Sequence, residues 1–127
     1  MQSLRFLFLF MLLAAGQALA APSPPISVAP QDVPVKGMVT MVDVGAKACI
    51  PCKMMTPVIE SLSAEYEGRA GIVFIDVWKN PQEAEKFGIR AIPTQIFYDK
   101  DGKEVMRHEG YFSKEEIIEV LTKLGVK

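Results

Sequence analysis

Cysteine, histidine and tryptophan are scarce in this sequence. The 127 residues include two cysteines, one histidine and one tryptophan. A structural zinc site takes four ligands, almost always cysteines and histidines, so the two cysteines would need a second subunit or other ligands to hold a metal. His108 lies far along the chain from both cysteines, and we expect its side chain to be solvated. The sequence therefore predicts neither a metal site nor a cofactor.

The chain also lacks an excess of charge of either sign. Fourteen lysines and arginines stand against fifteen aspartates and glutamates, which gives a formal net charge of −1. Proteins that bind nucleic acid or anionic membrane surfaces carry a basic excess, so we expect neither partner. The length allows one domain, and no internal repeat is visible. We also expect a monomer.

No apolar run reaches the length of about 20 residues that a membrane-spanning helix needs. The longest, residues 6–15, follows Arg5 and precedes the small-residue sequence Ala18-Leu19-Ala20. This order is typical of a secretory signal, so we predict that residues 1–20 are cleaved and that the protein is exported. The alternative is an uncleaved segment that tethers the protein to the membrane. Cleavage would remove Arg5 and no acidic residue, and the net charge would change from −1 to −2.

Residues 21–34 contain five prolines, a composition that favours an extended linker. We assign residues 21–37 to this linker and an N-terminal segment, and residues 38–127 to the folded domain.

Hydrophobic patterning in the domain predicts strands and helices in the order β-α-β-α-β-β-α. The first strand–helix–strand unit predicts a parallel pair with a right-handed crossover, and the last two strands predict a hairpin. The fold class is therefore α/β, with a mixed sheet and helices on both faces. The expected strands are residues 39–44, 71–77, 95–98 and 103–108, and the expected helices are residues 49–67, 80–87 and 113–124.

The two cysteines, Cys49 and Cys52, lie three residues apart where a helix is expected to begin. One helical turn brings both sulfur atoms to the same side, within the Cα separation of about 7 Å that a disulfide allows. Unpaired N–H groups at a helix N-terminus favour an anion, so the Cys49 thiol should lose its proton readily. We predict that Cys49 attacks and Cys52 resolves. A structural disulfide is the alternative, but so short a loop gains little entropy.

The sequence around this motif resembles the thioredoxin family over residues 38–124. Asp43 lies six residues before Cys49, where that family carries a buried acid, and Pro57 matches its helix-kinking proline. Ile92-Pro93-Thr94 is similar to its cis-proline loop, and Gly110 matches a glycine that faces the active site. The resemblance implies a thioredoxin fold with about four to five strands, and thiol–disulfide exchange.

The resemblance also implies roles for individual residues. Asp43 would take the proton of Cys52; the alternative is a strand-end polar residue bonded to the backbone. Pro93 would be cis and would expose the Ile92 backbone to a substrate strand; the alternative is an ordinary trans proline. Ile50, Pro51 and Gly110 would complete the surroundings of the cysteines.

Three positions depart from the family pattern. Ala48 stands where tryptophan is usual, Ile50 stands where glycine is usual, and the usual lysine of the second strand is missing from residues 72–75. The sole tryptophan, Trp78, is expected to pack or to lie on the surface near the end of that strand.

The uncharged pair Ile50-Pro51 favours a reductant of exported, disulfide-bearing proteins. By the resemblance, such a protein would work in the periplasm and be recharged by an inner-membrane thiol carrier. The alternatives are a disulfide-forming oxidase, a thiol-independent binding module and a metal-delivery module.

Overall fold

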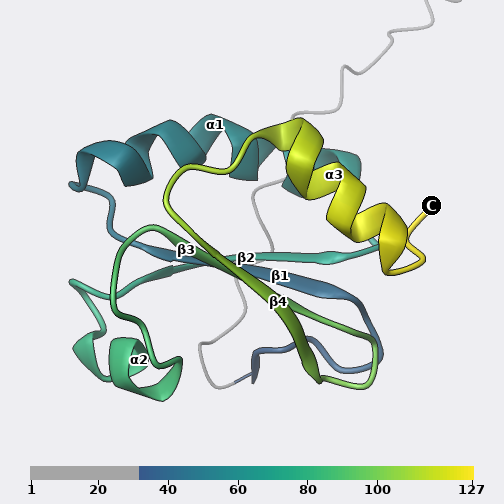
Figure 1. Cartoon of the computed structure of the whole chain (residues 1–127), viewed down its shortest axis with the longest axis horizontal. Helices are drawn as coiled ribbons and strands as arrows, with labels where there is room; N and C mark the ends of the chain where they lie inside the picture. Colours follow the sequence, from purple (N-terminus) through teal and green to yellow (C-terminus); the bar gives the residue numbers. More distant parts are fainter. Residues whose placement is uncertain (1–31) are drawn as a thin grey trace, which may run out of the picture.

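The computed structural model describes residues 32–127 and has one α/β fold (Figure 1). Its elements are β1 (Thr40–Gly45), α1 (Ile50–Glu65), β2 (Gly71–Asp76), α2 (Pro81–Lys86), β3 (Thr94–Tyr98), β4 (Glu104–Glu109) and α3 (Lys114–Lys123). The predicted order of elements is confirmed.

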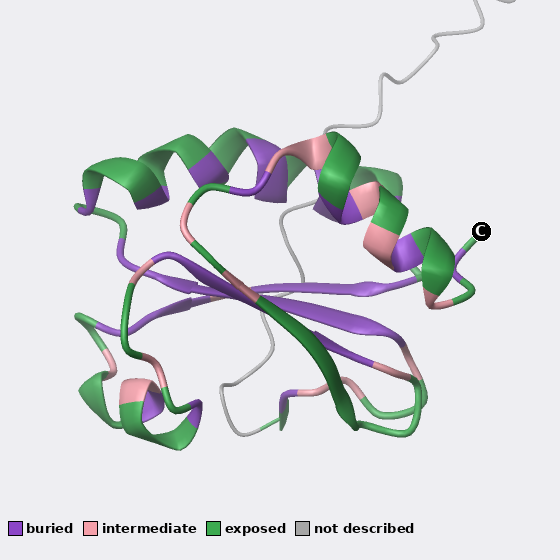
Figure 2. Ribbon diagram, viewed as in Figure 1, coloured by how far each residue is buried: buried purple, intermediate pink, exposed green. Residues whose placement is uncertain are grey.

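The four strands form one mixed sheet in the order β2-β1-β3-β4. β1 pairs in parallel with β2 and antiparallel with β3, and β3 and β4 form the predicted hairpin. β1 and β3 are buried along their whole length, whereas the edge strand β4 is mostly exposed (Figure 2). The near-continuous apolar runs of the inner strands follow from burial on both faces.

Helices cover both faces of this sheet, as predicted. α1 and α3 lie on one face and α2 lies on the other (Figure 1). Met55 and Leu62 of α1 and Ile117 of α3 pack with Met41 and Phe97 of the sheet. The opposite face is apolar as well, and its core consists of Val33, Val42, Val44, Val73, Ile75, Val77, Phe87, Ile96 and Tyr98. The central strand β1 therefore lies between two apolar cores, one on each face of the sheet.

Local sequence explains the ends of the helices. Ser113 caps α3 in a capping box with Glu116, as the sequence predicted. α1 ends at Glu65, two residues before the predicted end. The chain then turns through Gly68, whose φ of +73° is a conformation that favours glycine.

His108 differs from the prediction. Its ring is not simply solvated: it stacks on Phe112, with 4.1 Å between ring centroids and an interplanar angle of 17°. The Nε2 atom lies 3.1 Å from the carbonyl oxygen of Tyr111. His108 lies near the end of β4, opposite Gln95 of β3, and Phe112 belongs to the short loop between β4 and α3.

The predicted signal, residues 1–20, and most of the predicted linker lie outside the described residues. Val33, from the end of the segment that we assigned as linker and N-terminal segment, is buried in the core beside α2, and its bond to Pro34 is cis. No helix within residues 32–127 has the length and apolar character that crossing a membrane requires.

Candidate active site

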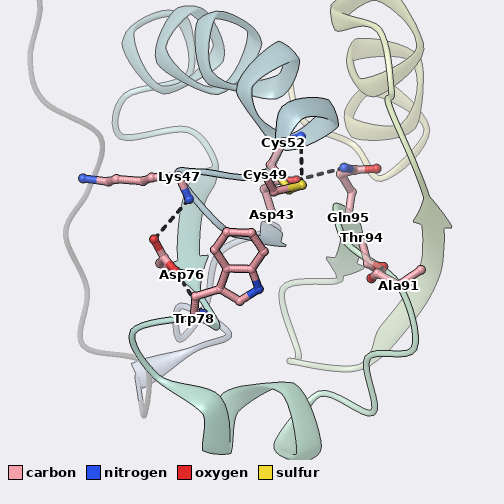
Figure 3. The surroundings of a disulfide bond; sticks show 9 residues. All are labelled: Asp43, Lys47, Cys49, Cys52, Asp76, Trp78, Ala91, Thr94 and Gln95. Atoms are coloured by element: carbon pink, nitrogen blue, oxygen red, sulfur yellow. Dashed lines mark hydrogen bonds between the residues drawn. A yellow bond between two sulfur atoms is a disulfide. The ribbon is translucent and has the colours of Figure 1, made fainter.

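Cys49 and Cys52 are joined by a disulfide at the N-terminus of α1, directly after β1 (Figure 3). Their Cα atoms are 5.2 Å apart. Cys49 is the N-cap residue, and its Sγ accepts a hydrogen bond from the backbone N–H of Cys52 at 3.4 Å. A helix N-terminus thus supplies a donor to the sulfur predicted to attack, and such a donor favours the thiolate.

Both cysteines are buried, and they differ slightly in their exposed fraction. Cys49 is 8% exposed and Cys52 is 2% exposed, so Cys49 is the outer of the two. Ile50 between them is 77% exposed, and the first turn of α1 contains no acidic residue. The surroundings of Cys49 are therefore apolar and without a negative charge on its own helix turn.

Gly45 at the end of β1 makes room for the inner sulfur. A Cβ atom at this position would lie 3.2 Å from the Sγ of Cys52 and 3.5 Å from the ring of Phe74. Because alternate residues of a strand face the same side, Asp43 shares the face of β1 on which Gly45 meets Cys52. The carboxyl group predicted to exchange a proton is thereby placed beneath the disulfide.

Asp43 is only 1% exposed. Burial raises the pKa of its carboxyl group from an ordinary value of 3.8 to about 6, and a hydrogen bond from Gln95 acts in the opposite direction. The Gln95 Nε2 donates to Oδ1 of Asp43 at 2.8 Å. The carboxyl group of Asp43 thus accepts a hydrogen bond from a side chain. The alternative interpretation required a bond to the backbone.

Gln95 was missed as a site residue by the sequence analysis. It lies opposite Asp43 in the register of β1 and β3 and is fully buried. The sequence did contain a sign of this role, because a buried amide side chain in an apolar strand needs a polar hydrogen-bond partner. The register that makes Asp43 this partner is a property of the folded sheet.

Asp76 at the end of β2 is a second missed residue. Its Oδ2 accepts the backbone N–H of Lys47, two residues before Cys49, at 3.1 Å. Its Oδ1 accepts the backbone N–H groups of Trp78 and Lys79 at 3.0 Å and 3.2 Å. Asp76 therefore ties the loop before the cysteines to the loop after β2 (Figure 3).

The predicted cis-proline loop lies against the disulfide. The Ile92–Pro93 bond is cis, and Ile92 packs against the cluster formed by Ala46, Cys49 and Cys52. The carbonyl oxygen of Pro93 accepts the backbone N–H of Gly110 at 2.8 Å, which brings Gly110 to the same loop.

The structure also shows where the residues that depart from the family pattern lie. Ala48 is exposed. Phe74 pairs with Asp43 from the β2 side, and the stretch of β2 where a lysine was expected is apolar. Trp78 is 60% exposed, so it lies on the surface. No group of three or more residues suited to hold a metal ion occurs within residues 32–127.

Comparison with known proteins decides the family. A family model described as Thioredoxin matches residues 31–123. The chain belongs to the thioredoxin family. A thioredoxin from Staphylococcus aureus strain Mu50 is 46% identical over 92 residues, which cover 72% of this chain and 88% of that protein.

Solved thioredoxin structures agree with this family. Thioredoxin NaTrxh from Nicotiana alata is 40% identical, with a TM-score of 0.61 over 68% of this chain and 73% of that one. Fasciola hepatica thioredoxin is 35% identical, with a TM-score of 0.61 over 69% and 82% of the two chains. The thioredoxin fold is thus confirmed.

With its Cys-x-x-Cys disulfide, this thioredoxin-family chain is a thiol–disulfide oxidoreductase. Membership of the family implies disulfide-bearing protein substrates and a reductase partner.

Proposed function

We propose that this protein reduces disulfides of exported proteins by dithiol–disulfide exchange through Cys49 and Cys52. The observation that carries the proposal is the Cys49–Cys52 disulfide at the N-terminus of α1, with the buried carboxyl group of Asp43 on the side of β1 that meets Cys52. Burial raises the pKa of this carboxyl group to about 6, so that it can exchange a proton near neutral pH. The uncharged pair Ile50-Pro51 supports the reducing direction, because a cation between the cysteines would stabilise the Cys49 thiolate and favour an oxidant.

The proposed cycle moves two electrons to the substrate. The Cys49 thiolate attacks one sulfur of a substrate disulfide, that S–S bond breaks, and the first substrate thiolate leaves. Cys52 then gives its proton to Asp43 and attacks the Cys49 sulfur. The mixed disulfide breaks, the second substrate thiolate leaves, and the Cys49–Cys52 disulfide forms.

Export is proposed from residues 1–20, which have the pattern of a secretory signal. In an oxidising compartment the Cys49–Cys52 disulfide must be reduced again after each cycle, so we propose the periplasm as the site of action and an inner-membrane thiol carrier as the electron donor. The alternative of an uncleaved tether would keep the same chemistry at the membrane surface.

The test is the reduction potential of the Cys49–Cys52 pair, measured by equilibrating the purified protein with dithiothreitol or glutathione buffers. We expect a value near that of thioredoxin, about −270 mV. A value near the oxidising end, about −120 mV, would make the protein a disulfide-forming oxidase instead.

The matched control is Cys49→Ser. This variant should show no reversible two-electron couple and should lose all disulfide reduction. Activity that survived the substitution would refute the redox mechanism and would point to a thiol-independent binding module.

A further inference from the structure

Asp43 and Gln95 form a buried polar pair under the disulfide (Figure 3). They face each other in the β1–β3 register, and the Nε2 of Gln95 donates to Oδ1 of Asp43 at 2.8 Å. Within residues 32–127, neither Oδ2 of Asp43 nor Oε1 of Gln95 has a hydrogen-bond partner. One carboxylate oxygen is therefore held while the other is left available.

The groups around Asp43 leave Gln95 as its only hydrogen-bonding side chain in the described part of the chain. α1 brings the two cysteines to this side of the sheet, and β2 contributes the uncharged Phe74. On β4, His108 pairs with Gln95, but its ring is stacked on Phe112 and its Nε2 meets the Tyr111 carbonyl. In α3, the carboxylate of Glu116 accepts a hydrogen bond from the backbone N–H of Ser113. It also interacts electrostatically with His108.

We propose that Gln95 is a positioning residue for proton transfer, which holds Oδ1 of Asp43 so that Oδ2 can accept the Cys52 proton. This inference rests on the role proposed above for Asp43. Gln95 stands in for the lysine that the resemblance led us to expect near the acid and that the chain lacks.

The choice of an amide has a chemical consequence. A lysine would add a full positive charge and would lower the pKa of the carboxyl group more than an amide donor does. An amide donor favours the carboxylate only partly, so Asp43 stays able to exchange its proton near neutral pH. If the donor were removed, burial alone would act, and the pKa of Asp43 would rise further above about 6.

The experiment compares the wild type with Gln95→Met, which keeps the side-chain volume and removes the donor. The carboxyl-carbon NMR signal of Asp43 is titrated in the oxidised protein, where the cysteines do not titrate. Since this hydrogen bond favours the charged carboxylate, we expect its loss to raise the pKa of Asp43 by about one to two units. The pH profile of mixed-disulfide resolution should shift upward by the same amount.

Double substitution isolates the pair. With Asp43→Asn as the background, Gln95→Met should leave the pH profile of resolution unchanged, because the group that Gln95 acts on is gone. An additional effect of similar size in this background would overturn the proposal, as would an unchanged pKa of Asp43 in folded Gln95→Met.

Gln95→Glu serves if Gln95→Met does not fold. It keeps the shape but places a second carboxyl group against Asp43, so the pair should titrate in two separated steps, the second at a pH well above the pKa of Asp43 in the wild type. A single unshifted titration would overturn the proposal. The NMR titration needs no substrate and no electron flow, so it decides the role of Gln95 even if the reduction potential shows the protein to be an oxidant.

Discussion

Asp43 is a carboxyl group in a strand that is otherwise apolar and buried on both faces. Because its folded-state pKa of about 6 lies above the unfolded value near 3.8, the folded protein holds this proton more tightly. The associated stability is fully present below about pH 4 and is lost as the pH rises through about 6. At neutral pH the ionised Asp43 therefore costs stability, and the proton transfer proposed above gives a reason for keeping this residue.

Asp43→Asn should remove this pH dependence. The variant keeps an acceptor at Oδ1 for Gln95 and cannot ionise. We expect it to be more stable than the wild type at pH 8, by roughly 3 kcal/mol for a shift of about two pKa units, and about equally stable at pH 4. Urea unfolding at both values of pH measures this. An equal change at pH 4 and pH 8 would contradict the buried, titrating carboxyl.

At the scale of elements, the site depends on how two loops meet. Cys49 is positioned by the start of α1, and the preceding loop is tied by Asp76 to the end of β2. Asp76 itself is buried, so its hydrogen bonds to backbone N–H groups are largely shielded from solvent. We expect such a link to fix the approach to the disulfide as well as to stabilise the fold.

Asp76→Ala should therefore change both stability and redox behaviour. Loss of the bonds should lower the free energy of unfolding by about 1–3 kcal/mol and should shift the reduction potential, because the loop before Cys49 is released. Asp99→Ala is the matched control, since Asp99 Oδ1 also accepts two backbone N–H groups, in the distant β3–β4 turn. A potential that moved equally in both variants would show a general loss of stability and no specific link.

At the scale of the whole molecule, the disulfide is separate from the two main apolar cores. Two apolar layers surround the sheet without a contribution from the cysteines, which form a small separate cluster with Ala46. The bond joins positions three residues apart, and so short a loop adds little to stability. This arrangement fits a bond that opens and closes while the fold persists.

Reduction of the disulfide should therefore leave the protein folded. We expect the reduced protein to lose about 2 kcal/mol of unfolding free energy or less, from the entropy of the closed loop, and to keep its far-UV circular dichroism. Urea unfolding with and without dithiothreitol checks this. Global unfolding on reduction would support the structural disulfide that we set aside.

The sequence determined the elements, the mixed sheet and the residues of the disulfide, because these follow from local patterns. Hydrophobic period, caps and the spacing of Cys49 and Cys52 are readable along the chain. The resemblance to thioredoxins carried Asp43 and the cis bond before Pro93, which no local pattern would have supplied.

Only the tertiary structure decided how distant residues complete the site. Gln95 meets Asp43 across a strand register, Asp76 reaches the loop before Cys49 from another strand, and Gly45 leaves space for the Cys52 sulfur. The physical reason is that register and helix placement set these contacts, and both result from packing the whole core rather than from neighbours in sequence.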